Sequence, residues 1–297
     1  MKHPVCLLAA ALCLSPLYGD FQEVVKKADQ LHEREAFAEG RGYLLSSLSQ
    51  AGSKAEEAEL CWRLARVYLN LGDQAEERKA AKGELLALFE EGEKAADRAL
   101  AADPGNALGY YWKSSNIGRW GQTKGILNSL AKAAPMKDLL EKTISLKPDH
   151  ADSYYVLGQL YEQLPGLPLS FGNKDYAVSL GRKAVDLQRE QLRTGLEKEV
   201  RYDFFTELAK HLYGRNWNTE KRLKEQAKKK ASFKAKSDLL LKSFYYEGVV
   251  ELKAVSDRQE AQELVRWVIG ELSSQASRKW SQGRDLREAQ MVLAGWK

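Results

Sequence analysis

Residues 144–161 read ISLKPDHADSYYVLGQLY, and this stretch decides the fold. Pro148 ends an apolar helical run, and the pair Tyr154-Tyr155 stands six residues later, on what reads as a new helix. The same arrangement occurs 44 residues earlier, where Pro104 precedes the pair Tyr110-Tyr111. An arrangement that recurs along the chain predicts a repeat protein, in which each pair of helices packs against the next.

The segment Tyr154-x-x-Leu157-Gly158-x-x-Tyr161 resembles the first helix of a tetratricopeptide repeat (TPR). Stretches that begin at Val24, Cys61 and Phe205 fit the same frame. In such a pair, large side chains of one helix pack against small ones of its partner, and the pair buries its remaining face against the next pair. We therefore expect an all-α chain of tandem antiparallel helix pairs, stacked as a TPR-like right-handed solenoid.

Further stretches narrow this resemblance. They are the runs 60–66, 111–113, 140–148 and 155–158, together with a long second helix expected over 75–102. In combination they look like the regulator-of-microtubule-dynamics family of TPR-like proteins over about Glu57–Gln163, roughly a third of the chain. The resemblance implies the fold. The family's function is not expected to transfer, because a protein with a bacterial-looking export signal would not meet microtubules.

That signal is indicated by the N-terminus. A positive start precedes an apolar core at Val5–Leu14, and Pro16 ends this core shortly before a predicted cleavage after Gly19. Ten apolar residues are too few to span a bilayer, which takes about 20. The alternatives are a buried N-terminal helix and a lipid anchor. The anchor is not favoured, because Cys6 and Cys13 lack the small preceding residue that it needs.

Cleavage would leave Cys61 as the single cysteine, so an internal disulfide is excluded. An exported chain without disulfides fits a periplasm-like space, and we expect a soluble periplasmic protein. The expected organisation is a signal peptide at 1–19, a TPR-like helical array at 20–236, and C-terminal helices at 237–297 that pack on or cap the array.

Composition and motifs do not favour catalysis. The 297 residues include 46 basic and 41 acidic side chains, a net charge of +5 that does not by itself indicate nucleic acid. His32, His150 and His211 are spread over different repeats and are assigned structural roles, so we expect no metal ion. Glycine loops for nucleotides and catalytic serine motifs are missing from the sequence, and we expect no cofactor and no enzymatic activity.

One segment is strongly basic. Residues 215–236 hold nine basic and two acidic side chains. One interpretation is a solvated helix face. The other is docking of an acidic partner or an anionic lipid surface, with membrane contact at most peripheral. The candidate docking residues are Lys221, Arg222, Lys228, Lys229 and Lys230.

The TPR resemblance also implies a binding groove, because equivalent positions on the first helix of each pair line a concave face. Aromatic side chains with Arg and Gln are typical anchors and suit an extended peptide, or a ligand with an apolar body and a polar or anionic end. The alternative is that Trp62, Tyr111 and Tyr155 belong partly to the core. The groove candidates are Trp62, Arg66, Tyr111, Ser115, Arg119, Tyr155, Gln159, Lys210 and Tyr213.

These features favour an exported, non-enzymatic scaffold that binds another envelope protein or a peptide through the groove. A second hypothesis is an accessory binding protein for a small amphipathic solute, acting beside the solute-binding protein of a periplasmic transporter. The third is an unrecognised enzyme. A closed apolar pocket would favour the solute, and an open polar channel would favour the scaffold.

Overall fold

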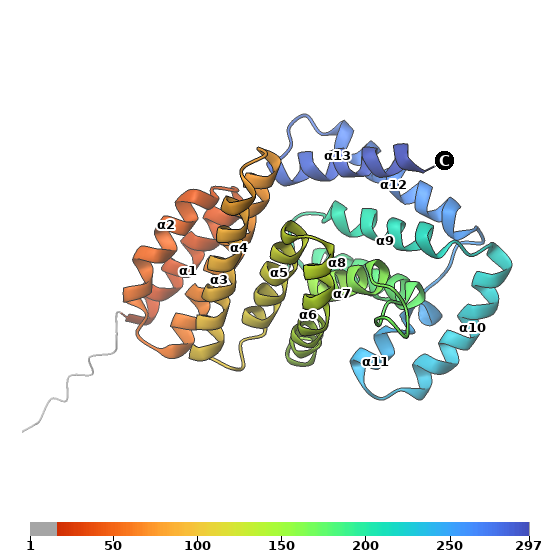
Figure 1. Ribbon diagram of the computed structural model, residues 1–297, viewed down its shortest axis with the longest axis horizontal. Coiled ribbons are helices and arrows are strands. Elements are labelled where there is room, and N and C mark those ends of the chain that lie inside the picture. Colours follow the sequence, from red (N-terminus) through yellow and green to blue (C-terminus); the bar gives the residue numbers. More distant parts are fainter. Residues whose placement is uncertain (1–16, 297) are drawn as a thin grey trace, which may run out of the picture.

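The computed structural model describes residues 17–296, and within that range the chain is helical and has no strand (Figure 1). The prediction of an all-α chain is confirmed. The α-helices are α1 (Leu17–Glu33), α2 (Phe37–Ser47), α3 (Lys54–Glu77), α4 (Lys82–Ala102), α5 (Ala107–Lys124), α6 (Ile126–Leu146), α7 (Ala151–Gln163), α8 (Lys174–Thr194), α9 (Tyr202–Arg215), α10 (Thr219–Ala235), α11 (Leu239–Ser243), α12 (Asp257–Ser274) and α13 (Trp280–Gly295), with 3-10 turns η1 (Leu48–Gln50) and η2 (Tyr246–Val249).

The first eight helices form antiparallel pairs: α1 with α2, α3 with α4, α5 with α6, and α7 with α8. Because α4 packs on α5 and α6 packs on α7, the pairs lie side by side in an arc (Figure 1). This is the TPR-like solenoid that the repeat pattern predicts. The residues of the pattern hold it together, since Tyr154, Leu157 and Tyr161 are all buried in one core cluster.

Close approach of neighbouring helices requires glycine at two positions. A Cβ at Gly72 of α3 would lie 2.3 Å from the ring of Phe89 on α4. A Cβ at Gly92 of α4 would lie 2.0 Å from the side chain of Asn116 on α5. The buried Asn116 amide donates to the carbonyl oxygen of Ala65 at 3.1 Å, so it links α5 to α3 through the gap that Gly92 leaves.

The stacking changes after α8. Helix α9 packs on α7 and α8, α12 packs along α9, and α10 leads away to contact η2. Helix α12 leads back toward the first pairs, and α13 begins there and runs back along α12 (Figure 1). The backbone N–H groups of Trp280 and Ser281 donate to the carboxylate of Glu35, at 2.6 and 3.0 Å, and the Trp280 ring lies against Phe37. Helix α13 therefore joins the C-terminal end of the arc to its N-terminal end.

The predicted signal peptide at 1–19 lies mostly outside the described residues. Its last three positions, 17–19, form the first turn of α1, which continues to Glu33. Among the described helices, none is both long enough and apolar enough to cross a membrane. The signal peptide and the boundary at residue 236 stay predictions.

Candidate functional site

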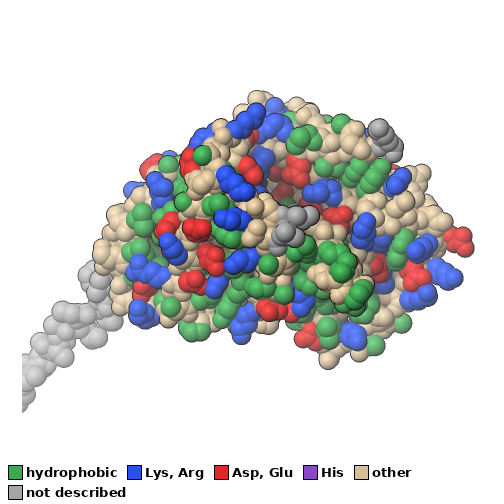
Figure 2. Space-filling model, viewed as in Figure 1, with side chains coloured by type: hydrophobic (Ala, Val, Ile, Leu, Met, Phe, Trp, Pro, Cys, Tyr) green, Lys and Arg blue, Asp and Glu red, His purple; other side chains and the backbone are tan. Residues whose placement is uncertain are grey.

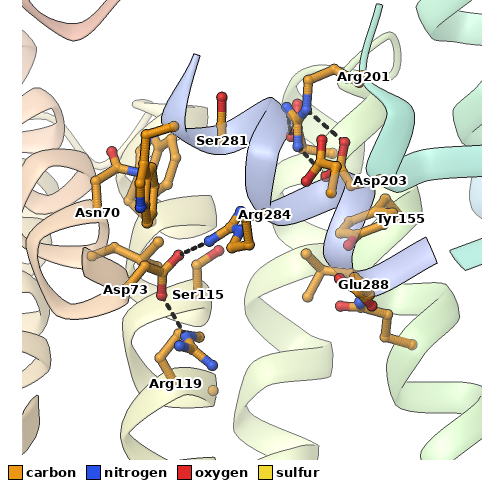
Figure 3. Close-up of a pocket in the computed structure, with 18 of the residues that line it drawn as sticks. Asn70, Asp73, Ser115, Arg119, Tyr155, Arg201, Asp203, Ser281, Arg284 and Glu288 are labelled. Atoms are coloured by element: carbon orange, nitrogen blue, oxygen red, sulfur yellow. Dashed lines mark hydrogen bonds and ion pairs between the residues drawn. The ribbon is translucent and has the colours of Figure 1, made fainter. Parts of the chain in front are cut away.

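A cavity of about 610 Å³ lies between the inner faces of α3, α5 and α7 and helix α13. We call it the channel. Asp73 of α3, Arg119 of α5 and Tyr155 of α7 face Arg284 and Glu288 of α13 across it (Figure 3). In the space-filling view, acidic side chains gather in the recess beside α13 (Figure 2). The channel is open to solvent and lined mainly by polar side chains.

Most of the groove candidates meet in this channel, and three do not. Tyr213 of α9 lies elsewhere and stacks on Trp296, with 4.2 Å between the ring centroids. Trp62 and Arg66 of α3 also lie outside. Whether the other candidates bind a ligand stays a prediction. The candidates that line the channel are Tyr111, Ser115, Arg119, Tyr155, Gln159 and Lys210.

Trp62 and Arg66 lie on a different stretch of α3 from the one that borders the channel. The channel face of this helix lies two turns further along, at Asn70 and Asp73. Trp62 is buried, and the guanidinium of Arg66 lies 5.1 Å from its ring while pairing with Asp29 at 2.7 Å. The ion pair between Arg66 and Asp29 links α3 to α1, and Trp62 is part of the core.

The two channel tyrosines differ in exposure. Tyr111 is buried, its ring lies edge-on to Trp112 and His150, and burial raises the pKa of its hydroxyl. Tyr155 is half-buried and stacks on Phe204 with ring centroids 4.7 Å apart. Tyr111 is therefore largely a core residue, as the alternative interpretation held, whereas Tyr155 presents part of its ring to the channel.

The charged lining of the channel has an acidic surplus, with nine carboxylates against five cations. The cations are already engaged. Arg119 donates to Asp73 at 2.8 Å and to Glu76 at 2.6 Å, and Arg284 donates to Asp73 at 2.9 Å. The acidic residues are Glu33, Glu35, Asp73, Glu76, Asp152, Glu199, Asp203, Asp285 and Glu288, and the basic ones are Arg119, Arg201, Lys210, Lys279 and Arg284.

Among the nine channel carboxylates, Asp285 of α13 has the fewest polar contacts. Its side chain is only 8% exposed, and it has no hydrogen bond or ion pair within residues 17–296. Burial, and then the nearby Asp203, raise the pKa of its carboxyl to about 7. Arg284 and then Arg201 oppose this shift without overcoming it. Arg284 donates to Asp73 at 2.9 Å, and Arg201 donates to Asp152 at 2.8 Å and to Asp203 at 2.7 Å. The channel therefore suits a cationic group better than the anionic one that Arg66 and Arg119 had suggested.

Sequence reasoning missed the α13 side of the channel. Arg284, Asp285 and Glu288 are on a helix that meets α3 across some 200 residues of chain, and no local pattern indicates that contact. The acidic residues on α13 carried no signal beyond the polar face that any surface helix has.

The basic segment on α10 divides into two sets. Lys221, Lys228 and Lys230 are exposed, and for them docking stays a prediction. Arg222 and Lys229 are buried, at 2% and 5% exposed, so they are not available to a partner. Both face inward because they share one side of α10, seven residues apart, and that side packs on η2.

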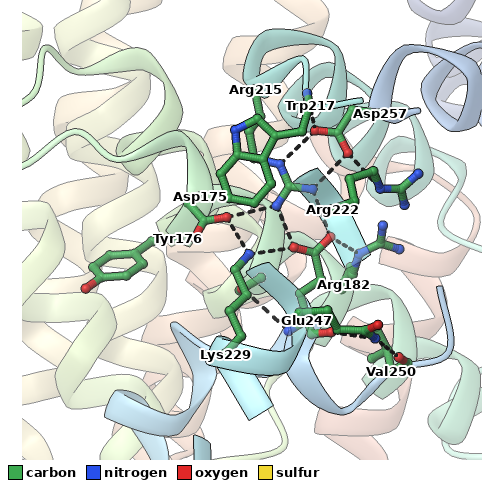
Figure 4. Close-up of polar contacts among 12 residues, drawn as sticks. Asp175, Tyr176, Arg182, Arg215, Trp217, Arg222, Lys229, Glu247, Val250 and Asp257 are labelled. Carbon is green, nitrogen blue, oxygen red and sulfur yellow. Dashed lines mark hydrogen bonds and ion pairs between the residues drawn. The ribbon is translucent and has the colours of Figure 1, made fainter. Parts of the chain in front are cut away.

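The two buried cations belong to what we call the charge cluster, which α8, α9, α10, η2 and α12 build together (Figure 4). Glu247 of η2 lies at its centre and accepts from Arg215 at 2.5 Å, from Lys229 at 2.5 Å and from Arg182 at 3.0 Å. Burial alone would raise the pKa of Glu247, but Arg215 and Arg182 outweigh it and hold this pKa well below its usual value. The members are four cations, Arg182, Arg215, Arg222 and Lys229, and four carboxylates, Asp175, Glu247, Asp257 and Glu260.

Comparison with known proteins gives one family. Residues 24–167 match the family described as regulator of microtubule dynamics protein 1-3. Relatives include regulator of microtubule dynamics protein 3 of Mus musculus, 27% identical over 67% of this chain and 43% of the relative, and protein 1 of Bos taurus, 32% identical over 47% and 41%. The chain thus spans under half the length of these relatives. The resemblance inferred from the sequence is confirmed and extends further toward the N-terminus than expected.

A solved structure is also similar. A thermophilic TPR protein of Thermus thermophilus aligns with 77% of this chain and 98% of its own, at 15% identity and a TM-score of 0.49. The fold class follows from the helix pairs described above.

The periplasmic location predicted from the N-terminus is wrong. The curated relatives come from animals, among them Mus musculus and Bos taurus, and these have no periplasm. The pattern at residues 1–19 was assigned to bacterial export from its composition alone, and composition does not identify the membrane system.

Proposed function

We propose that this chain, which over residues 24–167 resembles the regulators of microtubule dynamics, is a scaffold that binds an extended basic segment of a partner protein in its channel. One observation supports this above the others. The channel carries an acidic surplus around Asp285, a buried carboxyl without a partner within the described chain. Buried charged groups are normally paired, so an unpaired one that faces a cavity is suited to a cation brought by a ligand.

The shape of the channel favours a peptide. Cavities of roughly 300–1,000 Å³ hold ligands of drug size, so about 610 Å³ suits a few residues rather than a folded domain. An Arg or Lys side chain of the peptide would pair with Asp285 and Glu288. The exposed part of the Tyr155 ring would support the same cation or a neighbouring apolar side chain.

The polar lining of the channel supports the scaffold hypothesis over the solute-binding hypothesis. A small amphipathic solute needs a closed apolar pocket, whereas the channel is open and acidic. An envelope protein or a transporter subunit is no longer a specific expectation for the partner, because both depended on the periplasmic location. A scaffold role needs no catalytic residue, and we propose none.

The family resemblance supports the scaffold and does not name the partner. The shared residues 24–167 supply the α3, α5 and α7 side of the channel, while α9 and α13 lie beyond them. The relatives are named for regulating microtubule dynamics. For this chain we propose peptide binding, because the channel includes residues outside the shared part.

The test uses fluorescein-labelled hexapeptides and fluorescence anisotropy. We expect an alternating Arg-Leu peptide to bind and the matched Glu-Leu peptide to bind at least tenfold more weakly. Asp285→Asn should weaken binding of the Arg-Leu peptide about tenfold. Tyr155→Ala, made as a separate variant, should also weaken it. The control is Asp138→Asn, an exposed change on α6. Equal affinity for both peptides, or an unchanged affinity in Asp285→Asn, would overturn the proposal.

A further inference from the structure

We propose that Glu162, Glu207 and His211 form a binding site for one divalent transition-metal ion, for which Zn²⁺ is the representative. The site lies between α7 and α9. It does not depend on the function proposed for the channel. It also differs from the structural role that His211 was assigned from the sequence.

The geometry brings three ligand atoms together. Glu207 and His211 lie one turn apart on α9, and Glu162 reaches them from the end of α7. His211 Nδ1 lies 3.6 Å from Glu162 Oε2 and 3.8 Å from Glu207 Oε1, and the three atoms are all within 4.8 Å of one another. These separations are too long for hydrogen bonds. They are close to the spacing of atoms that share a zinc ion at about 2.0–2.2 Å from each.

The polar atoms at this site are unsatisfied. His211 is fully buried, and neither of its ring nitrogens has a hydrogen-bond partner in the described part of the chain. Glu207 is 2% exposed, and its Oε1 also lacks a partner there. Because buried polar groups are almost always paired, these atoms indicate a missing ligand. An ion between them would satisfy Nδ1 and both carboxylates at once.

Neighbouring residues fix the site in place. Gly158 and Gly181 leave room for the imidazole, since a Cβ at either position would lie 3.0 Å from the His211 ring. Lys210 donates to Oε2 of Glu207 at 2.6 Å, which orients that carboxylate and leaves Oε1 turned toward His211. Glu162 is the member most exposed to solvent, so an ion would enter from its side.

The donor set selects the class of ion. One imidazole nitrogen with two carboxylate oxygens suits Zn²⁺ and similar transition metals, whereas Mg²⁺ and Ca²⁺ prefer oxygen ligands throughout. The sequence holds a partial signal for this site, because Glu207 and His211 have the i, i+4 spacing of two ligands on one helix face. Glu162, 45 residues before Glu207, could not be placed there from the sequence.

The test uses tag-free, full-length protein treated with a chelator and then titrated with Zn²⁺ or Mg²⁺ by calorimetry, with metal content measured by mass spectrometry. We expect one Zn²⁺ per chain with micromolar or tighter affinity, and no Mg²⁺ uptake at the same concentration. Co²⁺ should bind in the same place and give visible absorption bands that report its coordination geometry.

Glu162→Gln and His211→Asn should each weaken Zn²⁺ binding at least tenfold and reduce the Co²⁺ bands at the same Co²⁺ concentration. Glu190→Gln, an exposed change on α8, is the matched control. If His211→Asn does not fold, as judged by circular dichroism, Glu162→Gln decides the matter, because Glu162 lies nearer the surface. Absence of Zn²⁺ uptake by the unmodified chain, or equal affinity in Glu162→Gln, would overturn the proposal.

Discussion

The charge cluster and the channel are built from the same kinds of side chain, but they differ in the balance of cations and carboxylates. Both gather charged residues from helices far apart in the sequence (Figures 3 and 4). In the charge cluster, four cations meet four carboxylates, and Glu247 alone accepts from three of those cations. In the channel, nine carboxylates meet five cations, and Asp285 has no partner within the described residues. Matched charges hold helices together, while surplus charge remains for a ligand.

The largest expected effect on stability comes from a change in the charge cluster. Glu247→Gln removes the charge that Arg182, Arg215 and Lys229 share, and it leaves buried cations undercompensated. We expect the free energy of unfolding to fall by about 3–5 kcal/mol. Urea unfolding followed by circular dichroism measures it. Glu225→Gln, a change on α10 outside the cluster, should stay within about 0.5 kcal/mol of the unmodified chain. A loss of that small size in Glu247→Gln would mean that the cluster does not hold these helices.

Asp285→Asn tests the acidic surplus of the channel. We expect this variant to raise the free energy of unfolding, whereas Glu247→Gln lowers it. The pKa of Asp285, about 7 in the folded chain, lies above the value of about 3.9 expected for an unfolded Asp. The folded chain therefore binds this proton more tightly, so Asp285 costs stability above pH 7, and the cost disappears as the pH falls toward 4. We expect Asp285→Asn to raise the free energy of unfolding by roughly 2–4 kcal/mol at pH 8 and to leave it unchanged at pH 4. Urea unfolding at both values checks this. Destabilisation at pH 8 would show that Asp285 has a partner after all.

The charge cluster should respond to acid in the other direction. The pKa of Glu247 is held below its usual value by Arg215 and Arg182, although burial opposes this. Its contribution to stability is therefore complete above the unfolded pKa near 4.3 and is lost as the pH falls through the folded pKa. We expect the unmodified chain to lose stability below about pH 4 and Glu247→Gln to lose less of it over the same range. Thermal melting between pH 3 and pH 6 compares the two chains. Parallel pH profiles would contradict this account.

A smaller effect is expected where α13 joins the first pairs. The Glu35 carboxylate accepts from the backbone N–H groups of Trp280 and Ser281 and so caps the N-terminus of α13. Loss of such a cap costs about 1 kcal/mol. Glu35→Gln should reduce stability by about that amount and speed hydrogen exchange in the first turn of α13. The exposed change Glu39→Gln on α2 is the control. Unchanged exchange in Glu35→Gln would mean that this contact does not hold α13 to the first pairs.

The smallest effect is expected on the outer face of α10. Reversal of Lys221, Lys228 and Lys230 to Glu should change the free energy of unfolding by only about 0.5 kcal/mol, because these side chains are exposed. The single change Lys229→Gln, between two of them, should cost several times more because Lys229 pairs with Glu247. Urea unfolding of the two variants compares neighbouring positions directly. A large loss in the triple variant would place the exposed lysines in the fold.

The sequence predicted the parts of this molecule that depend on local spacing. Tyr154, Leu157 and Tyr161 lie in the core as the repeat frame requires, and the channel positions on α5 and α7 follow from the same frame. On α3 the stretch that borders the cavity is at Asp73 and not at Trp62, because Asp73 contacts Arg284 of α13. The repeat frame carries no information on that contact.

The charges were harder to predict. The run of basic residues on α10 did not indicate which of its members are buried. The partners of Arg222 and Lys229 come from α8, η2 and α12, which lie elsewhere in the sequence. The surplus in the channel depends on α13 in the same way. Pairing between distant helices is not encoded in any short stretch of sequence.

The most direct test of the account measures binding and stability on the same two variants. Asp285→Asn changes the channel and Glu247→Gln changes the charge cluster. Anisotropy of the Arg-Leu hexapeptide gives the affinity, and urea unfolding gives the stability, at pH 8 and at a temperature where both variants are folded. We predict that Asp285→Asn binds about tenfold more weakly without losing stability, and that Glu247→Gln loses stability while its affinity stays the same. Loss of affinity in Glu247→Gln alone, or equal losses in both variants, would contradict the division between surplus and matched charge.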